Sequence, residues 1–229
     1  MLEHLRNRLI ASCQPVDGGP MDRPQIVAAM AQAAVAGGAA ALRIQGIDNL
    51  LAVRPKVQVP VIGIVKRDFS DSPVRITALV DDVFGLIAAG ADIVAVDATD
   101  RPRPVPVTDL LATIRAAGVL AMADCASIED ARRARDIGFD IIGSTLSGYV
   151  GGPIPEAPDF RLLNEMRGLG GFIVAEGRFN SPMLAAEAVR AGADAVTVGS
   201  ALTRIEYVTG WFADAIESAA DAGSGRARP

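Results

Sequence analysis

The sequence has few of the side chains that carry metal, thiol or histidine chemistry. In 229 residues it has one histidine, His4, and two cysteines, Cys13 and Cys125. Two cysteines cannot build a disulfide framework or a four-ligand zinc site, and a single histidine near the start of the chain argues against a Ser-His-Asp or Cys-His site. A histidine-rich metal site is excluded. We therefore expect a protein that works without a metal.

Aromatic residues and long apolar runs are also scarce. Aromatics make up 4% of the chain although half of it is hydrophobic, so the core must be aliphatic. No apolar run approaches the ~20 residues of a membrane span, and charges interrupt the apolar residues of segment 1–12, unlike a signal peptide. These absences predict a soluble cytoplasmic protein with no membrane partner.

Positive charge is not in excess. The chain has 22 Lys and Arg against 27 Asp and Glu, a formal net charge of −5. Nucleic acid backbones require clustered positive charge, so we expect no nucleic acid partner. A small phosphorylated ligand remains compatible, because it needs only one local site.

Eight short apolar runs with β propensity recur along the chain, separated by helical stretches. Continuous apolar runs are typical of strands covered on both faces, as in parallel sheets. About 29 residues per unit fits a single (β/α)8 TIM barrel over 1–222, with a disordered tail at 223–229. A doubly wound sheet is the alternative, but no GxGxxG turn supports it. The runs are 8–12, 40–44, 61–65, 92–96, 119–123, 140–144, 172–175 and 195–198.

Each predicted strand ends in a polar residue or in glycine. One such residue means little, because strands end in polar loops, but a barrel brings all eight ends to one mouth. The residues at these ends are Gln14, Arg43, Lys66, Asp97, Asp124, Thr145, Glu176 and Gly199-Ser200.

Lys66 and Glu176 are the candidates for proton chemistry. Burial at the mouth would lower the pKa of Lys66, which could then act as a general acid or base or as a Schiff-base nucleophile. The alternative is a solvent-reaching lysine paired to Asp68. Glu176 could act as an acid, a base or a hydroxyl anchor, or it could form a structural ion pair with Arg178.

The loops after the seventh and eighth strands carry the features of a phosphate site. In many such barrels these loops bind phosphate through glycine amides and a helix N-terminus. The alternative is a simple Gly-Ser helix cap, but both loops carry the needed residues together. The candidates are Gly177, Arg178, Gly199, Ser200 and Arg204.

Three further features have a structural interpretation beside the functional one. Asp97 and Asp124 could bind substrate hydroxyls or Lys66; Asp124 could instead cap a helix, although Ser127 is the better cap. The RPRP segment (101–104) is predicted to be a stiff loop with exposed arginines. Cys13 and Cys125 could form a racemase-like thiol pair, but buried apolar cysteines are commoner.

The chain resembles the N-acetylmannosamine-6-phosphate 2-epimerase family. The combination of KRD, AEGR and GSTLSGY is specific, because generic phosphate-binding barrels do not share it. The matching stretches span nearly the whole chain in the family's order: SCQ (12–14), GGAAALRIQG (37–46), PVIGIVKRDF (60–69), AGADIVAVDATDRPRP (89–104), MADCAS (122–127), GFDIIGSTLSGY (138–149), IVAEGRFNSP (173–182) and VGSALTR (198–204).

The resemblance implies a (β/α)8 epimerase without a metal or a redox cofactor, so no cofactor is expected. The implied reaction is the interconversion of N-acetyl-D-mannosamine 6-phosphate and N-acetyl-D-glucosamine 6-phosphate. The resemblance places the family's catalytic lysine on Lys66 and its essential glutamate on Glu176. Its sugar-contacting residues fall on Gln14, Arg43 and Asp124, and Thr145 is added from its strand-end position. Its phosphate ligands fall on Gly177, Arg178, Gly199 and Ser200, with Arg204 nearby.

Two other functions remain open at this point. One is a Schiff-base aldolase or lyase acting on a phosphorylated keto-acid through Lys66. The other is a non-catalytic sugar-phosphate-binding barrel, although such a binder would not need both Lys66 and Glu176. A homodimer is expected only from the resemblance, and we expect segment 76–79 and the pair Trp211-Phe212 to lie in the core.

Overall fold

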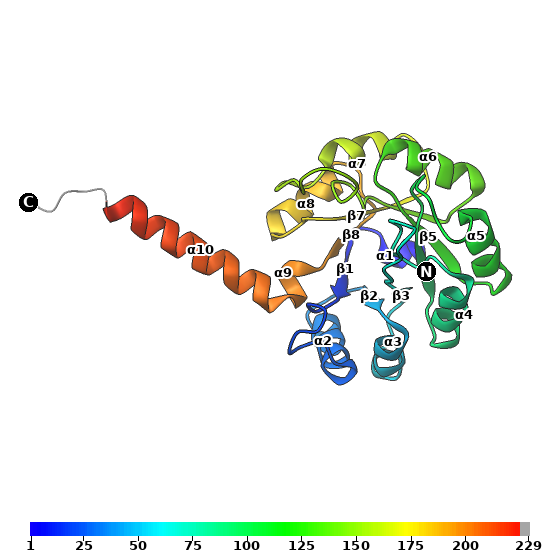
Figure 1. The fold of residues 1–229 in the computed structure, drawn as a ribbon, viewed down its shortest axis with the longest axis horizontal. Helices are drawn as coiled ribbons and strands as arrows, with labels where there is room; N and C mark the ends of the chain where they lie inside the picture. Colours follow the sequence, from blue (N-terminus) through cyan, green and yellow to red (C-terminus); the bar gives the residue numbers. More distant parts are fainter. Residues whose placement is uncertain (225–229) are drawn as a thin grey trace, which may run out of the picture.

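A computed structural model describes residues 1–224 and shows a closed barrel of eight parallel strands in chain order (Figure 1). Every predicted apolar run overlaps one strand, which confirms the (β/α)8 prediction. The strands are β1 (Arg8–Cys13), β2 (Ala41–Gln45), β3 (Val61–Ile64), β4 (Ile93–Asp97), β5 (Leu120–Asp124), β6 (Ile141–Gly143), β7 (Phe172–Glu176) and β8 (Ala195–Val198).

Helices surround the barrel and connect its strands (Figure 1). The short α1 precedes β1 and places Leu5 among the residues of the barrel interior. The helices are α1 (Leu2–Leu5), α2 (Pro24–Ala36), α3 (Ile47–Val53) followed by a 3-10 turn (Arg54–Lys56), α4 (Val80–Ala88), α5 (Val107–Ala116), α6 (Ile128–Ile137), α7 (Phe160–Arg167), α8 (Pro182–Arg190), α9 (Ser200–Thr203) and α10 (Ile205–Ser224).

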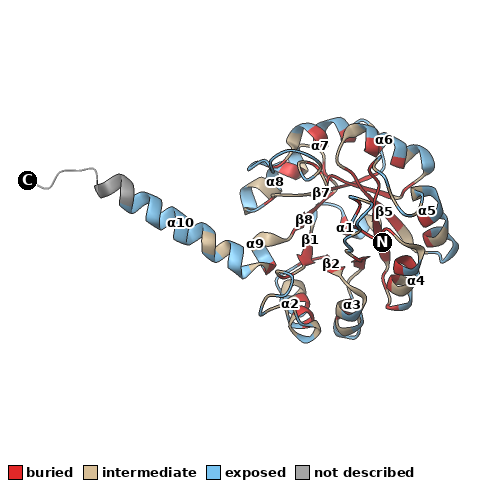
Figure 2. Cartoon of the chain, viewed as in Figure 1, coloured by how far each residue is buried: buried red, intermediate tan, exposed pale blue. Residues whose placement is uncertain are grey.

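The hydrophobic core has two layers, one on each face of the barrel wall, and the strands are buried on both faces (Figure 2). Ile10, Ile62, Ile64 and Ile93 belong to the interior layer, where branched aliphatic side chains fill the barrel. The second layer lies between strands and helices. This arrangement explains why a chain with few aromatics can fill its core.

Glycine ends the helices that lead into four of the strands. Gly38, Gly90, Gly138 and Gly192 have φ values of 104°, 91°, 96° and 112°. These left-handed angles are costly for other residues. The similar sequences AGGAAAL (36–42), AGADIVAV (89–96), IGFDIIG (137–143) and AGADAVTV (191–198) therefore reflect the same left-handed backbone turn at each of these joints.

A capping box begins α6. The Ser127 hydroxyl accepts a hydrogen bond from the Asp130 amide, and the Asp130 carboxylate accepts one from the Ser127 amide. The predicted cap at Ser127 is confirmed, and Asp124 is free for another role.

Helix α10 departs from the expected arrangement. It extends away from the barrel (Figure 1), and its side chains are largely exposed (Figure 2). Trp211 is 40% exposed and Phe212 is 68% exposed, so the prediction of a core role for this pair is wrong. Segment 76–79 is largely buried, as predicted. The helix continues to Ser224, two residues into the predicted tail, and the rest of that tail, 225–229, lies outside the described residues.

Across residues 1–224, none of the helices has the length and apolar character needed to cross a membrane.

Replacing Ser127 with alanine removes the side-chain acceptor of the α6 cap. We expect the free energy of unfolding to fall by about 1 kcal/mol, because an orphan amide loses its partner. Activity should persist, since Ser127 does not line the cavity described below. Chemical denaturation of both proteins measures the difference, and an unchanged stability would contradict this account of the cap.

Candidate active site

A cavity of about 360 Å³ opens among the loops at the carboxyl ends of the strands. All predicted site residues except Asp124 line it, although they come from segments far apart in the sequence. They are Gln14, Arg43, Lys66, Thr145, Glu176, Gly177, Arg178, Gly199, Ser200 and Arg204.

Arg43 lies at the centre of the site. It is the third residue of β2 and not its end, as the sequence suggested, and strand alternation turns it into the barrel, where it is 1% exposed. Its Nη1 and Nη2 donate to the two Asp124 carboxylate oxygens at 3.1 and 2.5 Å. Nη1 also lies 3.3 Å from Glu176 Oε2. A buried guanidinium requires such partners, so Asp124 and Glu176 are held in place by its charge.

Asp124 has a second partner. The Thr145 hydroxyl, in the loop after β6, donates to Asp124 Oδ1 at 2.7 Å. Asp124 is fully buried beneath the cavity. Asp124 therefore orients the Arg43 guanidinium and neutralises its charge.

Lys66 follows β3 and is held by a short chain of hydrogen bonds. Its Nζ donates to Gln14 Oε1 at 2.6 Å, and Gln14 Nε2 donates to Ser12 Oγ at 2.6 Å. Arg204 Nε donates to the Gln14 carbonyl at 3.0 Å. Lys66 is thus fixed at the cavity wall. The alternative pairing with Asp68 does not occur, because Asp68 pairs with Arg75.

The surroundings change the proton affinity of both candidate acid-base groups. Burial lowers the pKa of Lys66 to about 8, and the positive charges of Arg43 and Arg204 act in the same direction. Burial raises the pKa of Glu176, while the attraction of Arg43 opposes that shift. A substantial fraction of Lys66 is therefore neutral at pH values where an ordinary lysine is charged.

Arg178 does not pair with Glu176, so that alternative is wrong. Its Nε and Nη1 donate to the carbonyls of Ala157 and Ser147 at 2.8 and 2.6 Å. Its guanidinium also lies 5.2 Å from the ring centre of Tyr149. Arg178 therefore joins the loop after β6 to the loop after β7, at the edge of the cavity.

Residues that follow β8 line the same cavity. Gly199 precedes the four-residue helix α9, which has no side-chain cap, so the simple cap interpretation does not account for Ser200. Arg204 follows this helix, and its guanidinium lies 5.5 Å from the ring centre of Tyr207. The structure brings the five predicted phosphate ligands to one side of the cavity.

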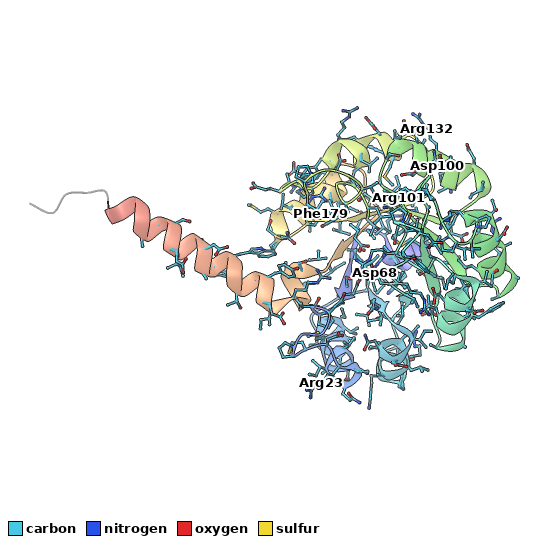
Figure 3. All side chains as sticks on the ribbon, viewed as in Figure 1. Arg23, Asp68, Asp100, Arg101, Arg132 and Phe179 are labelled. Carbon is cyan, nitrogen blue, oxygen red and sulfur yellow. The ribbon has the colours of Figure 1, made fainter. Side chains whose placement is uncertain are left out.

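The RPRP loop contributes more to the cavity than the sequence indicated. Arg101 (labelled in Figure 3) pairs with Asp97 at 2.6 Å and lines the cavity with it; its side chain is only 20% exposed. Arg103 Nη2 donates to the Asp97 carbonyl, which holds the loop in place. The prediction of exposed arginines is wrong for Arg101, and Asp97 binds neither Lys66 nor Arg43.

The two cysteines are buried in the layer between strands and helices, away from the cavity. Burial raises the pKa of Cys13 to about 12 and that of Cys125 well above its ordinary value. Both thiols stay protonated, which is unsuited to a racemase-like pair.

Comparison with known proteins agrees with this arrangement. The family model described as "Putative N-acetylmannosamine-6-phosphate epimerase" matches residues 27–218. Relatives with the corresponding 2-epimerase name occur in Actinobacillus pleuropneumoniae serotype 5b and Haemophilus influenzae. They are 58% and 56% identical over 219 residues, which is 96% of this chain and 96% of each relative. The chain belongs to the N-acetylmannosamine-6-phosphate epimerase family.

Solved structures support the same assignment. The N-acetylmannosamine-6-phosphate 2-epimerase from Clostridium perfringens is 37% identical, with a TM-score of 0.91 over 93% of this chain and 95% of that one. A thiamine phosphate pyrophosphorylase from Pyrococcus furiosus, at 18% identity and a TM-score of 0.59 over 86% of this chain and 88% of that one, shares the fold alone.

The cavity of this epimerase-family chain also contains residues that sequence reasoning missed. Ser12, Arg101, Tyr149 and Thr197 all line it. Alternation along β1 and β8 could have revealed Ser12 and Thr197, because each is a polar residue on the interior face of an apolar strand. Tyr149 in the GSTLSGY motif and Arg101 in the RPRP segment reach the cavity through loops, and neither motif predicts that contact.

Residues 1–224 contain no group of three or more His, Cys, Asp or Glu side chains arranged to hold a metal ion.

Replacing Arg204 with glutamine tests the electrostatics of Lys66. Wild-type kcat/KM should rise as pH increases through about 8, as neutral Lys66 forms. The substitution removes a positive charge that favours the neutral amine, so the pKa of Lys66 should rise and this limb should move to higher pH. Epimerisation rates measured from pH 6 to 10 give both profiles. A limb that stays in place would contradict the assigned influence of Arg204.

Proposed function

We propose that this protein is an epimerase that interconverts N-acetyl-D-mannosamine 6-phosphate and N-acetyl-D-glucosamine 6-phosphate. The observation that carries the proposal is one cavity lined by a lysine of lowered pKa, by a largely buried glutamate and by the five residues that we propose as phosphate ligands. Membership of the epimerase family and the 2-epimerase names of its relatives support it.

The chemistry required is inversion at C2 of the sugar. The C2 proton is acidic only when C1 is a carbonyl, so the ring must open first. Neutral Lys66 then takes the C2 proton and becomes an ammonium, and the electron pair of the C–H bond moves to give an enolate with its charge on O1. A proton from the Lys66 ammonium, or one relayed by Glu176 while the ammonium releases its proton to solvent, then adds to the opposite face of C2 and gives the epimer.

Each remaining site residue has a role in this scheme. Glu176 holds or relays a proton at the sugar hydroxyls during ring opening and closure. Arg43, oriented by Asp124, stabilises the enolate oxygen, because a fixed positive charge in a water-poor site favours developing negative charge. Gln14 and Thr145 contact the open-chain sugar.

The 6-phosphate anchors the far end of the substrate. Its binding energy orients C2 relative to Lys66. The ligands proposed for it are Gly177, Arg178, Gly199, Ser200 and Arg204, which line one side of the cavity.

Proton NMR of N-acetylmannosamine 6-phosphate in deuterated water tests the reaction and the role of Lys66 together. Wild-type protein should form the second epimer with loss of the C2 proton signal. Lys66→Ala should abolish both, because no other amine lines the cavity. The chain has one other lysine, the exposed Lys56, and Lys56→Ala is a matched control that should retain both. Retained C2 exchange in Lys66→Ala would contradict the assignment.

Two measurements on the wild-type protein distinguish the epimerase from the two alternative functions. A Schiff-base lyase would form a covalent adduct at Lys66 that borohydride traps, whereas the epimerase forms none. A non-catalytic binder would leave the NMR spectrum of the sugar phosphate unchanged. The family match favours neither alternative.

We also propose that the protein is a cytoplasmic homodimer that uses α10 as its contact. Ile205, Phe212 and Ile216 are 61%, 68% and 69% exposed, and their spacing places them on one face of the helix. This helix extends from the barrel without covering its own strands (Figure 1). In a symmetric dimer the apolar faces of the two α10 helices cover each other. The two free buried cysteines fit a reducing compartment.

Charge placed on the apolar face of α10 should prevent dimer formation. We expect wild-type protein to have twice the chain mass of 23.7 kDa in sedimentation or light-scattering measurements. The double variant Phe212→Glu and Ile216→Glu should be monomeric, because burying two carboxylates is costly. Asp214→Lys on the opposite face is the control. A dimer that persists in the double variant would place the interface elsewhere.

A further inference from the structure

Thr197 is a buried cavity residue for which the scheme above gives no role. It is the third residue of β8, it is 2% exposed, and it lines the cavity. Its hydroxyl has no hydrogen bond of good geometry among the described residues, yet it lies close enough to Glu176 to lower the pKa of that carboxylate. A buried hydroxyl is nearly always paired, so an unpaired one at a reaction site indicates a function.

The register of the barrel limits the groups that this hydroxyl can reach. On one side Thr197 pairs with Ile10 of β1, which is apolar. On the other side it pairs with Glu176 of β7, whose side chain lines the same cavity. Glu176 Oε2 has an ion-pair contact with Arg43 at 3.3 Å but accepts no hydrogen bond. The polar neighbour at this level of the barrel is therefore the Glu176 carboxylate.

The same site already contains one threonine-carboxylate pair. The Thr145 hydroxyl donates to Asp124 at 2.7 Å, and that carboxylate is held against Arg43. Thr145 therefore fixes one of the two carboxylates that flank Arg43. Thr197 occupies a comparable position beside the other carboxylate.

We propose that Thr197 is a positioning residue for Glu176, and that its hydroxyl donates a hydrogen bond to the Glu176 carboxylate during the reaction. The bond stabilises the ionised carboxylate and keeps it directed toward the sugar hydroxyls. This inference rests on the role of Glu176 proposed above. Thr197 acts through Glu176 and contributes nothing to phosphate binding.

The stability of the protein separates this role from a packing role. Valine has the same shape as threonine and lacks the hydroxyl. An unpaired buried hydroxyl destabilises the fold, so Thr197→Val should leave the melting temperature unchanged or raise it. A packing residue would instead lower it when replaced.

Kinetics of three variants, each measured by the NMR assay after wild-type turnover has been shown, test the proposal. Thr197→Val should lower kcat roughly tenfold or more with little change in KM, because a hydrogen bond to a charged group is lost. Thr197→Ser retains a hydroxyl and should restore most of kcat. Thr113→Val, at a half-buried position of α5 outside the cavity lining, is the matched control and should behave as wild type.

The pH dependence of kcat distinguishes a positioning role of Thr197 from a packing role, because only a positioning role would shift it. Glu176 is faced by Arg43 from β2, by Lys66 after β3 and by Asp124 from β5, and all three remain in the variant. Loss of the hydroxyl should raise the pKa of Glu176. The limb of the kcat profile that reports Glu176, as distinct from the limb near pH 8 assigned to Lys66, should therefore move to higher pH in Thr197→Val and not in Thr197→Ser.

A Thr197→Val variant whose kcat and pH profile equal those of wild-type protein would overturn the inference. Equal losses in the Val and Ser variants, or a loss accompanied by a lower melting temperature and no shift of the limb, would also overturn it. Full activity of Glu176→Gln would instead refute the proposed role of Glu176, so the two failures are distinguishable.

Discussion

The neutralisation of one buried charge determines how the site is built. Arg43 is almost fully buried within an aliphatic barrel, where an unpaired guanidinium would strongly destabilise the fold. Its partners come from two other strands, Asp124 at the end of β5 and Glu176 at the end of β7. The same ion pairs that allow Arg43 to be buried also place a positive charge between two fixed carboxylates at the floor of the cavity.

This arrangement reverses the charge of the protein locally. The chain as a whole carries a formal net charge of −5. However, Arg43, Arg178 and Arg204 all line the cavity, where their positive charges favour an anionic ligand such as a sugar phosphate. The charges of Arg43 and Arg204 also favour the neutral form of Lys66. The same positive charges therefore favour an anionic ligand and the neutral form of Lys66.

Much of this site could be predicted from the sequence, because side chains alternate along each strand and all eight strands end at the same mouth of the barrel. Lys66, Glu176, Gln14 and the phosphate loops follow apolar runs, and the closed sheet brings such positions to one mouth. What the sequence could not predict depends on side chains that meet across strands or loops. The Arg43 ion pairs, the contacts of Arg178 with the loop after β6 and the inward turn of Arg101 leave no local signal. The exposed position of α10 could not be predicted either. The sequence of an apolar helix face is the same whether that face packs against its own chain or against another copy.

Burial, assisted by the positive charges of Arg43 and Arg204, makes Lys66 a base near neutral pH, and direct titration of Lys66 tests this most sharply. The chain has two lysines, so NMR of protein with isotope-labelled lysine gives two side-chain signals, and Lys56→Arg identifies which belongs to Lys66. The account predicts a pKa of about 8 for Lys66. A value near the ordinary ~10.4 of lysine would contradict it.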